Sequence, residues 1–282
     1  MRLSKVTIAY SLLFPLFLLF SGCGSLFFYP QKQMYDNPVV RQFSPEDIYF
    51  KTSDGLTLHG WFFQTANLEA HATILVLHGN AENLSTHVNS VLWLIKEGFN
   101  LFIFDYRGYG KSEGSPSIKG VHLDAESALN ALLSVPRVDK ERIIVLGQSI
   151  GGAIAVYTVA HTPHKDRIAA LVIDSAFSSY RLIAREKLAQ FFITWPFQYP
   201  LSYLVSDAYS PIRWIREVSC VPVLIIHGAK DPVVPMHHGQ MLYDAAQGPK
   251  EFWETTVPGH VRSFADAGVR DKLVRYLTAQ LQ

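Results

Sequence analysis

The stretch Arg142-Ile143-Ile144-Val145-Leu146-Gly147-Gln148-Ser149-Ile150-Gly151-Gly152 decides the fold. Its apolar run predicts a strand over residues 142–146, and residues 150–160 predict a helix directly after it. Residues 147–151 fit the pattern G-x-S-x-G, in which small residues allow a turn tight enough to expose the serine. The start of the helix also directs free N–H groups and the positive end of its dipole at this turn. The pattern therefore predicts Ser149 as a nucleophile at the edge of a sheet.

Strands and helices alternate on both sides of this stretch, which indicates parallel strands with helices on both faces. The first two strands must be antiparallel, because only the short turn Ser53-Asp54-Gly55 joins them. We therefore predict one α/β domain over residues 47–282, with a mostly parallel sheet of about eight strands. The expected strands are 48–51, 56–63, 73–77, 100–104, 142–146, 169–173, 223–226 and 251–256. The expected helices are 83–97, 117–133, 150–160, 236–246 and 261–281.

The interval from Ser175 to Val218 interrupts this alternation. It is too long for one crossover and is rich in aromatic residues. We predict a small helical cap over about residues 175–218, at the edge where such sheets bind ligands. The alternative is that these helices cover the core without a role in binding.

A serine hydroxyl needs a base to become a nucleophile. In the G-x-S-x-G fold the chain order is serine, acid, histidine. Asp231 and His260 both follow predicted strands, so both are expected at the sheet edge that carries Ser149. We expect His260 to accept the Ser149 proton and Asp231 to orient the ring. Asp174, after the strand over 169–173, is a rival for the acid or a structural cap.

The sequence Leu77-His78-Gly79-Asn80-Ala81 follows the strand over 73–77. Loops at this position supply half of an oxyanion hole, the set of donors that stabilises a tetrahedral intermediate. We expect the backbone N–H groups of Asn80 and Ile150 to be these donors. A plain glycine turn is the alternative.

Five motifs occur in the order expected for one known fold: His78-Gly79-Asn80, Asp105-Tyr106-Arg107-Gly108-Tyr109-Gly110-Lys111-Ser112, Gly147-Gln148-Ser149-Ile150-Gly151, His227-Gly228 with Asp231, and Pro258-Gly259-His260. Together they resemble the α/β-hydrolase superfamily. Within it, they resemble the single-domain hydrolases related to serine aminopeptidases and to eukaryotic protein depalmitoylases.

The resemblance implies acyl transfer from an ester, a thioester or, less often, an amide to water, without a cofactor. It also implies that Arg107 and Tyr109 shape the loop next to the nucleophile. Glu82 departs from the pattern, because many relatives have glycine there. Its carboxylate would discourage anionic substrates.

Charge and cysteine content exclude several other classes of protein. The chain carries 25 Lys and Arg against 24 Asp and Glu, a net charge of +1, which gives no footprint for nucleic acid. Two cysteines exclude a disulfide scaffold and a cysteine-rich metal site. His237 and His238 are adjacent, and adjacent helix positions do not face the same way. We expect them to be solvated, and we predict no metal or other cofactor.

The N-terminus carries the signature of an exported protein. Arg2 and Lys5 precede a short apolar run over residues 6–20, and small residues follow it. Phe20-Ser21-Gly22-Cys23 resembles the lipobox of bacterial lipoproteins, although position 20 is usually leucine. The resemblance implies a signal peptide over residues 1–22, a lipidated Cys23 and a location in the bacterial cell envelope, with the outer membrane favoured. A plain signal anchor with an incidental cysteine is the alternative.

Residues 23–46 are expected to be a lipid-anchored tether, with three prolines among mixed polar residues. Its aromatic group, residues 27–29, suits either the membrane interface or the edge of the domain. Removal of residues 1–22 takes away two positive charges and no acid, so the net charge changes from +1 to −1.

The leading hypothesis is a lipid-anchored, monomeric serine hydrolase acting on a small-molecule or acylated substrate. A peptidase is the first alternative, and Glu82, Glu186 or Asp207 are candidates to hold an α-ammonium group. A non-catalytic surface binding protein is the second alternative.

Overall fold

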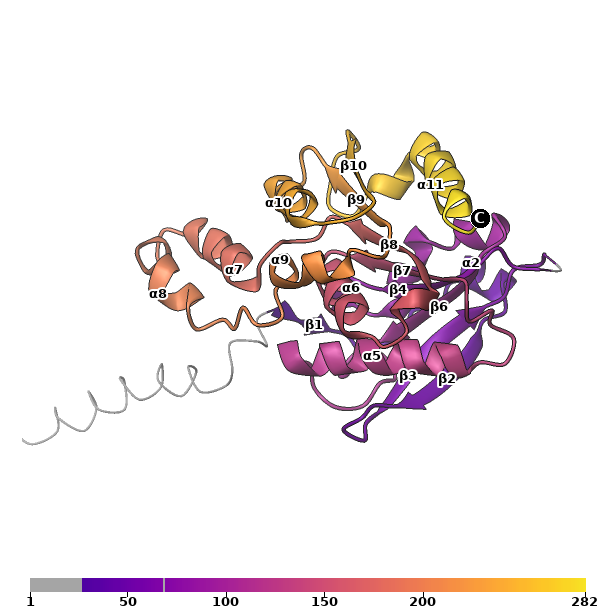
Figure 1. Ribbon diagram of the computed structural model, residues 1–282. Helices are drawn as coiled ribbons and strands as arrows, with labels where there is room; N and C mark the ends of the chain where they lie inside the picture. The colour runs from indigo at the N-terminus through magenta and orange to yellow at the C-terminus, as the bar shows by residue number, and fades with distance from the viewer. Residues whose placement is uncertain (1–26, 68) are drawn as a thin grey trace, which may run out of the picture.

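The computed structural model describes residues 27–67 and 69–282. Its centre is an eight-stranded sheet in the order β10-β9-β8-β7-β4-β6-β3-β2 (Figure 1). The strands β2 and β3 pair in an antiparallel manner, as do β3 and β6, whereas the other neighbours are parallel. This confirms the α/β-hydrolase arrangement expected from the sequence. The bounds are β2 Glu46–Lys51, β3 Thr57–Phe63, β4 Thr73–Leu77, β6 Asn100–Asp105, β7 Ile143–Gln148, β8 Ile168–Asp174, β9 Val223–Gly228 and β10 Lys250–Thr255.

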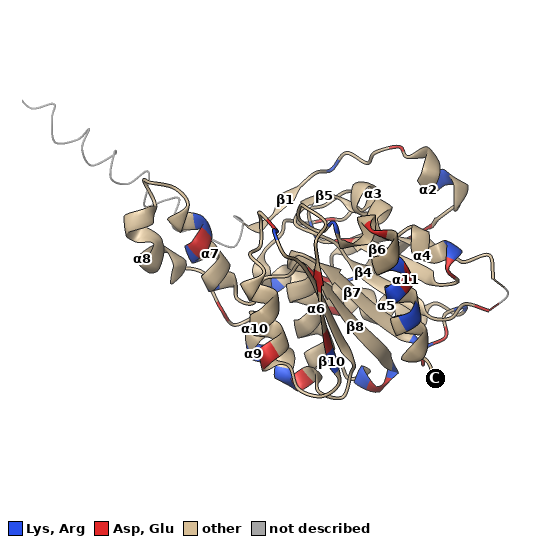
Figure 2. Ribbon diagram, turned by 90° about the horizontal axis from the view of Figure 1, so that it is seen from above, with Lys and Arg blue, Asp and Glu red and all other residues tan. Residues whose placement is uncertain are grey.

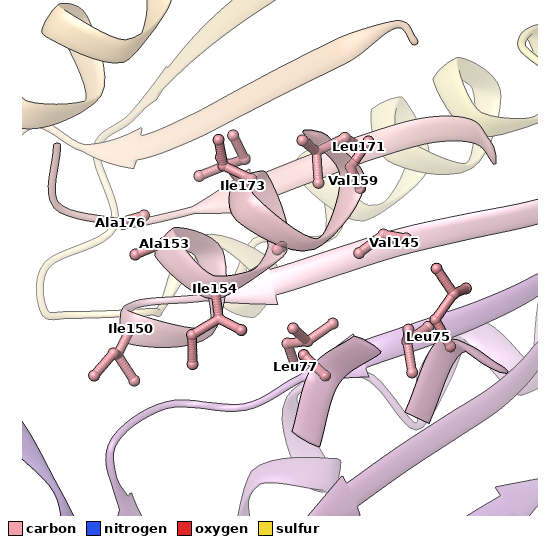
Figure 3. Close-up of a cluster of buried hydrophobic side chains, with 14 of the residues drawn as sticks. Leu75, Leu77, Val145, Ile150, Ala153, Ile154, Val159, Leu171, Ile173 and Ala176 are labelled. Carbon is pink, nitrogen blue, oxygen red and sulfur yellow. The ribbon is translucent and has the colours of Figure 1, made fainter. Parts of the chain in front are cut away.

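Helices cover both faces of the sheet, and each face has its own apolar core. Alternate side chains of one strand enter different cores: Leu75 and Leu77 of β4 pack on one side, and Ile74 and Val76 on the other. The first core also contains side chains of α5 (Ile118–Ser134), α6 (Ile150–His161) and α10 (His237–Ala245). Figure 3 shows part of it, with Ile150, Ala153 and Ile154 of α6 beside the strands. The second core contains side chains of α3 (Leu84–His87), the 3₁₀ turn Val88–Ser90, α4 (Trp93–Lys96) and α11 (Ala267–Ala279).

Two helix boundaries differ from the sequence expectation. The helix expected over 83–97 consists of the three short pieces α3, Val88–Ser90 and α4. The last helix begins at Ala267 rather than at 261, because the side chain of Asp266 caps it by accepting a hydrogen bond from the N–H of Val269. The residues before it form a loop and a short 3₁₀ turn, Ser263–Ala265. In the described part of the chain no helix is long and apolar enough to cross a membrane.

The segment expected to be a tether packs onto the domain from Phe27 onward. The two-residue strand β1 (Tyr29–Pro30) pairs with β5 (Ala81–Glu82), and the short helix α2 (Pro38–Gln42) follows it. Phe28 and Val40 are buried, one in each core. Burial of these apolar side chains stabilises the packed arrangement over a free chain. Cys23 and the predicted signal peptide lie outside the described residues.

The insertion after β8 is helical, as expected, but it does not cover the site of Ser149. It contains α7 (Tyr180–Ala189), a 3₁₀ turn at Trp195–Phe197, α8 (Gln198–Ser202), α9 (Pro211–Trp214) and a second 3₁₀ turn at Ile215–Val218. In both ribbon views α7 and α8 project from the body as a hairpin (Figures 1 and 2). We call residues 180–205 the α7–α8 hairpin.

Candidate active site

Ser149 lies on a strained turn between β7 and α6. Its φ of 56° is in the left-handed region, which non-glycine residues rarely adopt. The turn is possible because its neighbours are small: a Cβ on Gly147 would lie 2.4 Å from the Gly151 carbonyl oxygen, and one on Gly151 would lie 2.0 Å from that of Leu77. The G-x-S-x-G sequence therefore forms the sharp turn expected from it.

His260 connects Ser149 to Asp231. The imidazole Nε2 lies 2.8 Å from the Ser149 Oγ, and Nδ1 lies 2.7 Å from the Asp231 Oδ2. Because the carboxylate accepts from Nδ1–H, Nε2 is left to accept the serine proton. The structure thus brings together three side chains that are 82 and 29 residues apart in the sequence.

Asp231 is held in place from its other side. Its Oδ1 accepts the N–H groups of Val233 and Val234 at 2.8 and 2.9 Å. Burial alone would raise the pKa of Asp231, but the hydrogen bonds from His260 and from these N–H groups lower it overall. The carboxylate is therefore ionised beside the ring at neutral pH.

Asp174, the rival acid, has a different set of partners. Its carboxylate accepts hydrogen bonds from Gln148, Ser175 and Ser263, at distances of 3.1, 3.1 and 2.9 Å. Burial raises its pKa. Asp174 orients the residue before Ser149 and the loop after His260, and it makes no hydrogen bond to the His260 ring.

The loop after β4 lies beside Ser149, where an oxyanion donor is needed. A Cβ on Gly79 would lie 3.8 Å from the Ser149 Cβ. Buried His78 donates from Nδ1 to the Gly79 carbonyl at 2.7 Å. This bond fixes the peptide between Gly79 and Asn80, so it fixes the direction of the Asn80 N–H. Ile150 begins α6 directly after Ser149, where a helix has unpaired N–H groups.

Tyr109 and the N-terminal segment hold the same loop from behind. The Tyr109 hydroxyl donates to the Asn80 carbonyl at 2.5 Å, and the Tyr29 N–H donates to it at 3.0 Å. Buried Arg107 forms ion pairs with buried Asp124 and with half-exposed Asp54. The structural roles expected for Arg107 and Tyr109 agree with these contacts.

His87 was not anticipated from the sequence. Its ring stacks on His78 with centroids 4.9 Å apart, and its Nε2–H donates to the Ala81 carbonyl at 2.7 Å. Burial, together with the neighbouring His78, lowers the pKa of His87 to about 4, so the ring is neutral. Nothing in the local sequence marks this role, because the contact depends on how α3 folds back over the loop.

A cavity of about 590 Å³ opens at Ser149 and His260. Its walls come from residues 79–90, from the turn at Gln148 and Ser149, and from the segment that leads from His260 into α11, and none come from residues 175–218. The expected contribution of the helical insertion to the cleft is therefore absent. The lining presents more apolar than polar surface, and it includes the charged residues Glu82, Arg262 and Arg270. Glu82 has a φ of 59°, which explains why glycine suits this position in relatives.

One group among the described residues has the composition of a metal site: Glu186, His237 and His238. His237 is half-exposed, but His238 is buried rather than solvated as expected. The N–H of Ser178 donates to His238 Nδ1, so its Nε2 carries the proton that it donates to Glu186 at 3.1 Å. This tautomer gives Nε2 no lone pair for a metal, and the group instead joins α7 to α10.

The sequence profile of the family described as serine aminopeptidase, S33, matches residues 68–213, slightly more than half of the chain. The chain belongs to the serine aminopeptidase S33 family. This S33-family chain is 35% identical over 263 residues to the uncharacterised protein YfhR of Escherichia coli K12, covering 91% of the chain and 88% of the relative. It is 34% identical over 214 residues to protein bem46 of Schizosaccharomyces pombe, covering 73% and 68%.

Solved structures agree on the fold of this S33-family member. The Pyrococcus furiosus esterase Pf2001 superposes with a TM-score of 0.69 at 23% identity, covering 92% of this chain and 98% of that one. An α/β-hydrolase from Vibrio vulnificus gives a TM-score of 0.71 at 19% identity, covering 87% and 88%. Family and fold together establish a hydrolase of the α/β type.

Proposed function

We propose that this hydrolase cleaves carboxylic ester or thioester bonds through an acyl-enzyme on Ser149. The observation that carries the proposal is the unbroken chain of hydrogen bonds from Asp231 through His260 to Ser149. Glycines that could not carry a side chain form the tight turn that keeps Ser149 at the cavity wall, at the end of these hydrogen bonds.

In the proposed mechanism His260 Nε2 takes the Ser149 proton as Oγ attacks the acyl carbon. The resulting imidazolium is stabilised by ionised Asp231. The oxyanion lies against the N–H groups of Asn80 and Ile150, each of which contributes about 3 kcal/mol to the transition state. The imidazolium then protonates the leaving alcohol or thiol. In the second half, His260 activates a water molecule, which releases the acid and regenerates Ser149.

The test is turnover of a panel of p-nitrophenyl esters and one S-acyl thioester by wild type and Ser149→Ala. Loss of Ser149 is expected to lower kcat by a factor on the order of 10⁴ to 10⁶. Ser178→Ala is the matched control, because Ser178 is a buried serine whose hydroxyl contacts His238 outside the cavity. Retained turnover in Ser149→Ala, with its circular dichroism unchanged, would rule out the acyl-enzyme.

A peptidase acting on N-terminal residues is the second candidate, and one observation favours it. Of the three acids expected from the sequence, Glu82 alone lines the cavity, whereas Glu186 binds His237 and His238, and Asp207 caps α7. Among the described residues the Glu82 carboxylate has no hydrogen-bond or ion-pair partner, and a carboxylate in the cavity that contains Ser149 suits an α-ammonium group. Aminoacyl amides cleaved faster than acyl esters, with Glu82→Gln raising KM for the amides alone, would establish the peptidase.

We further propose that the protein is a lipoprotein of the bacterial cell envelope, anchored through Cys23. The lipobox-like sequence Phe20-Ser21-Gly22-Cys23 supports this proposal. Several acyl chains on one cysteine anchor a protein stably, whereas a single chain is marginal. Palmitate incorporation that is lost in Cys23→Ala and kept in Cys220→Ala tests it. Equal incorporation in both variants would contradict it.

A further inference from the structure

The outer end of the α7–α8 hairpin consists of exposed apolar side chains. Phe192 is 93% exposed and Ile193 is 82% exposed, and Phe191, Trp195, Phe197 and Tyr199 are each more than half exposed. Proteins rarely leave such a contiguous apolar patch in water unless it docks on something. The described walls of the active-site cavity do not use it.

Two arginines lie nearer the body on the same hairpin. Arg181 and Arg185 are one helical turn apart on α7, and each stacks over a tyrosine of the facing segment, Tyr203 at 4.8 Å and Tyr199 at 5.2 Å. They line a cavity of about 240 Å³ between the two arms of the hairpin. Among the described residues neither guanidinium forms an ion pair, and Arg181 Nε is buried without a hydrogen-bond partner.

The sequence of side chains along the hairpin follows the layers of a bilayer. Apolar residues occupy the tip, aromatic residues come next, and unpaired cations lie closest to the body. Aromatic rings favour the boundary between headgroups and acyl chains, and arginine binds headgroup phosphate. Figure 2 shows the charges on α7 and none on α8.

The position of the first described residue places this hairpin near a membrane. Phe27 packs edge-on against Tyr180, the first residue of α7, with ring centroids 5.3 Å apart. Only three residues lie between Cys23 and Phe27, and the four Cα-to-Cα steps that join them span at most about 14 Å. The 10 residues of α7 extend about 15 Å from the same point. A lipid on Cys23 therefore keeps the base of the hairpin about as close to the bilayer surface as α7 is long. The tip of the hairpin can then reach the bilayer.

We propose that the α7–α8 hairpin docks on an anionic phospholipid bilayer, with its apolar tip below the headgroups and Arg181 and Arg185 against headgroup phosphate. The inference rests on the proposed anchoring at Cys23, which sets the side that faces the membrane. Docking of the hairpin would hold the active-site cavity near the bilayer. We therefore propose that its substrates are acyl groups on membrane-associated molecules. The cavity rim at Ala81 and Glu82 pairs directly with β1, two residues after Phe27, so it lies beside the segment that leads to the anchor.

The test uses the full chain, purified from membranes and reconstituted into phosphatidylcholine vesicles that contain phosphatidylglycerol and acyl-brominated lipid. Bromine quenches tryptophan fluorescence only at contact. We expect Trp195→Phe to remove most of the quenchable signal, and Trp61→Phe, on β3 at the far side of the sheet, to remove none. Equal quenching in the two variants would overturn the proposal.

A second pair of variants tests whether docking needs the two arginines. The double variant Arg181→Gln/Arg185→Gln is expected to lower the ratio of docked to undocked hairpin about tenfold or more. Arg213→Gln/Arg216→Gln removes the same charge from exposed sites on α9 and the following turn, and is expected to match wild type. An equal loss in both double variants would contradict a phosphate-binding role.

Two further measurements separate docking on a bilayer from self-association and from the proposed chemistry. A second copy of the chain could cover the tip, in which case sedimentation in detergent shows a dimer that Phe192→Asp dissociates, and Trp195 is not quenched. That result would overturn docking on a bilayer. Ser149→Ala is expected to be quenched like wild type, so a failure of the proposed chemistry does not alter this measurement.

Discussion

The cavity rim and the α7–α8 hairpin are built in opposite ways. The rim, residues 79–90, is bound by segments far away in the sequence: the side chain of Asn83 donates to the carbonyls of Gln31 and Gln33, and the N–H of Leu84 donates to buried Asp105. Within the described part of the chain, the hairpin makes such hydrogen bonds only as far along as Glu186, which binds His237 and His238. The hydrogen bonds of residues 187–205 stay within the hairpin.

The contrast fits the two roles that we propose, catalysis at the rim and docking by the hairpin. Oxyanion donors act only if their positions are fixed before the substrate arrives, so the rim gains from every bond that immobilises it. A docking surface needs exposed apolar area and few bonds to the body. Variants of the rim and of the hairpin should therefore differ in their effects on activity and on stability.

The largest expected effect is on kcat, and it distinguishes Asp231 from Asp174 as the acid that acts on His260. Asp231→Asn removes the charge that stabilises the His260 imidazolium and is expected to lower kcat by about 10⁴. Asp174→Asn keeps one side-chain oxygen, which can still accept from Ser175 and Ser263, and it is expected to lower kcat by less than about tenfold. Steady-state kinetics on one p-nitrophenyl ester measures both. A larger loss in Asp174→Asn would reverse the assignment of the acid.

The next effect concerns stability. Phe104→Ala leaves a cavity in the first core, where Phe104 packs on Tyr106, whose hydroxyl donates to the His78 carbonyl, and it is expected to cost about 3–5 kcal/mol in the free energy of unfolding. Phe192→Ala, at the tip of the hairpin, is expected to change it by less than about 0.5 kcal/mol. Urea denaturation followed by circular dichroism measures both values. A large cost for Phe192→Ala would mean that the tip is packed against something in solution.

These two regions also differ in how far the sequence predicted them. Strands buried on both faces appear as continuous apolar runs, so residues 73–77 and 169–173 were found within one residue at each end. Ser149, Asp231 and His260 were predicted from the chain order serine, acid, histidine that goes with G-x-S-x-G, together with the position of each residue after a predicted strand. The structure brings them into hydrogen-bond distance.

The hairpin and the N-terminal segment could not be predicted in the same way. The aromatic residues of the insertion indicated burial over the cleft, whereas the structure exposes them, because hydrophobicity alone does not say which surface covers a side chain. The pairing of β1 with β5 involves two residues on each side, which is too short to leave a pattern. The late start of the last helix depends on a single capping carboxylate, Asp266.

A pH-dependent effect is expected at the base of the hairpin. His122 is buried among Tyr157, Tyr180 and Tyr209, and burial lowers its pKa from 6.5 to about 4. Between these values the unfolded chain binds a proton that the folded chain does not, so stability falls as pH decreases from about 6.5 to about 4. The loss attributable to His122 is on the order of 1–3 kcal/mol.

Urea denaturation at pH 7.5 and pH 5 measures this slope in wild type and in His122→Gln. The variant, which has no titrating ring, is expected to lose less stability over the same interval. His71→Gln is the control, because His71 is exposed and does not contribute to the lowered pKa of His122. Identical slopes in wild type and His122→Gln would show that His122 is protonated in the folded protein.

The smallest expected effect tests how the rim is held. Burial raises the pKa of Tyr109, so its hydroxyl remains a donor to the Asn80 carbonyl at neutral and alkaline pH. Tyr109→Phe removes that bond and keeps the ring, and it is expected to lower kcat by about tenfold with little change in KM. Tyr49→Phe, an exposed tyrosine on β2, is the control. A change in KM alone would indicate a role in substrate binding instead.

The most direct test of the proposed chemistry is to map the covalent adduct formed by a fluorophosphonate. The full chain is treated with the reagent, digested, and sequenced by mass spectrometry, beside His260→Ala and Ser178→Ala. We predict one phosphonyl group, on Ser149, formed with loss of fluoride, absent in His260→Ala and unchanged in Ser178→Ala. An unlabelled Ser149 in folded wild-type protein, or a label on another residue, would contradict the acyl-enzyme mechanism.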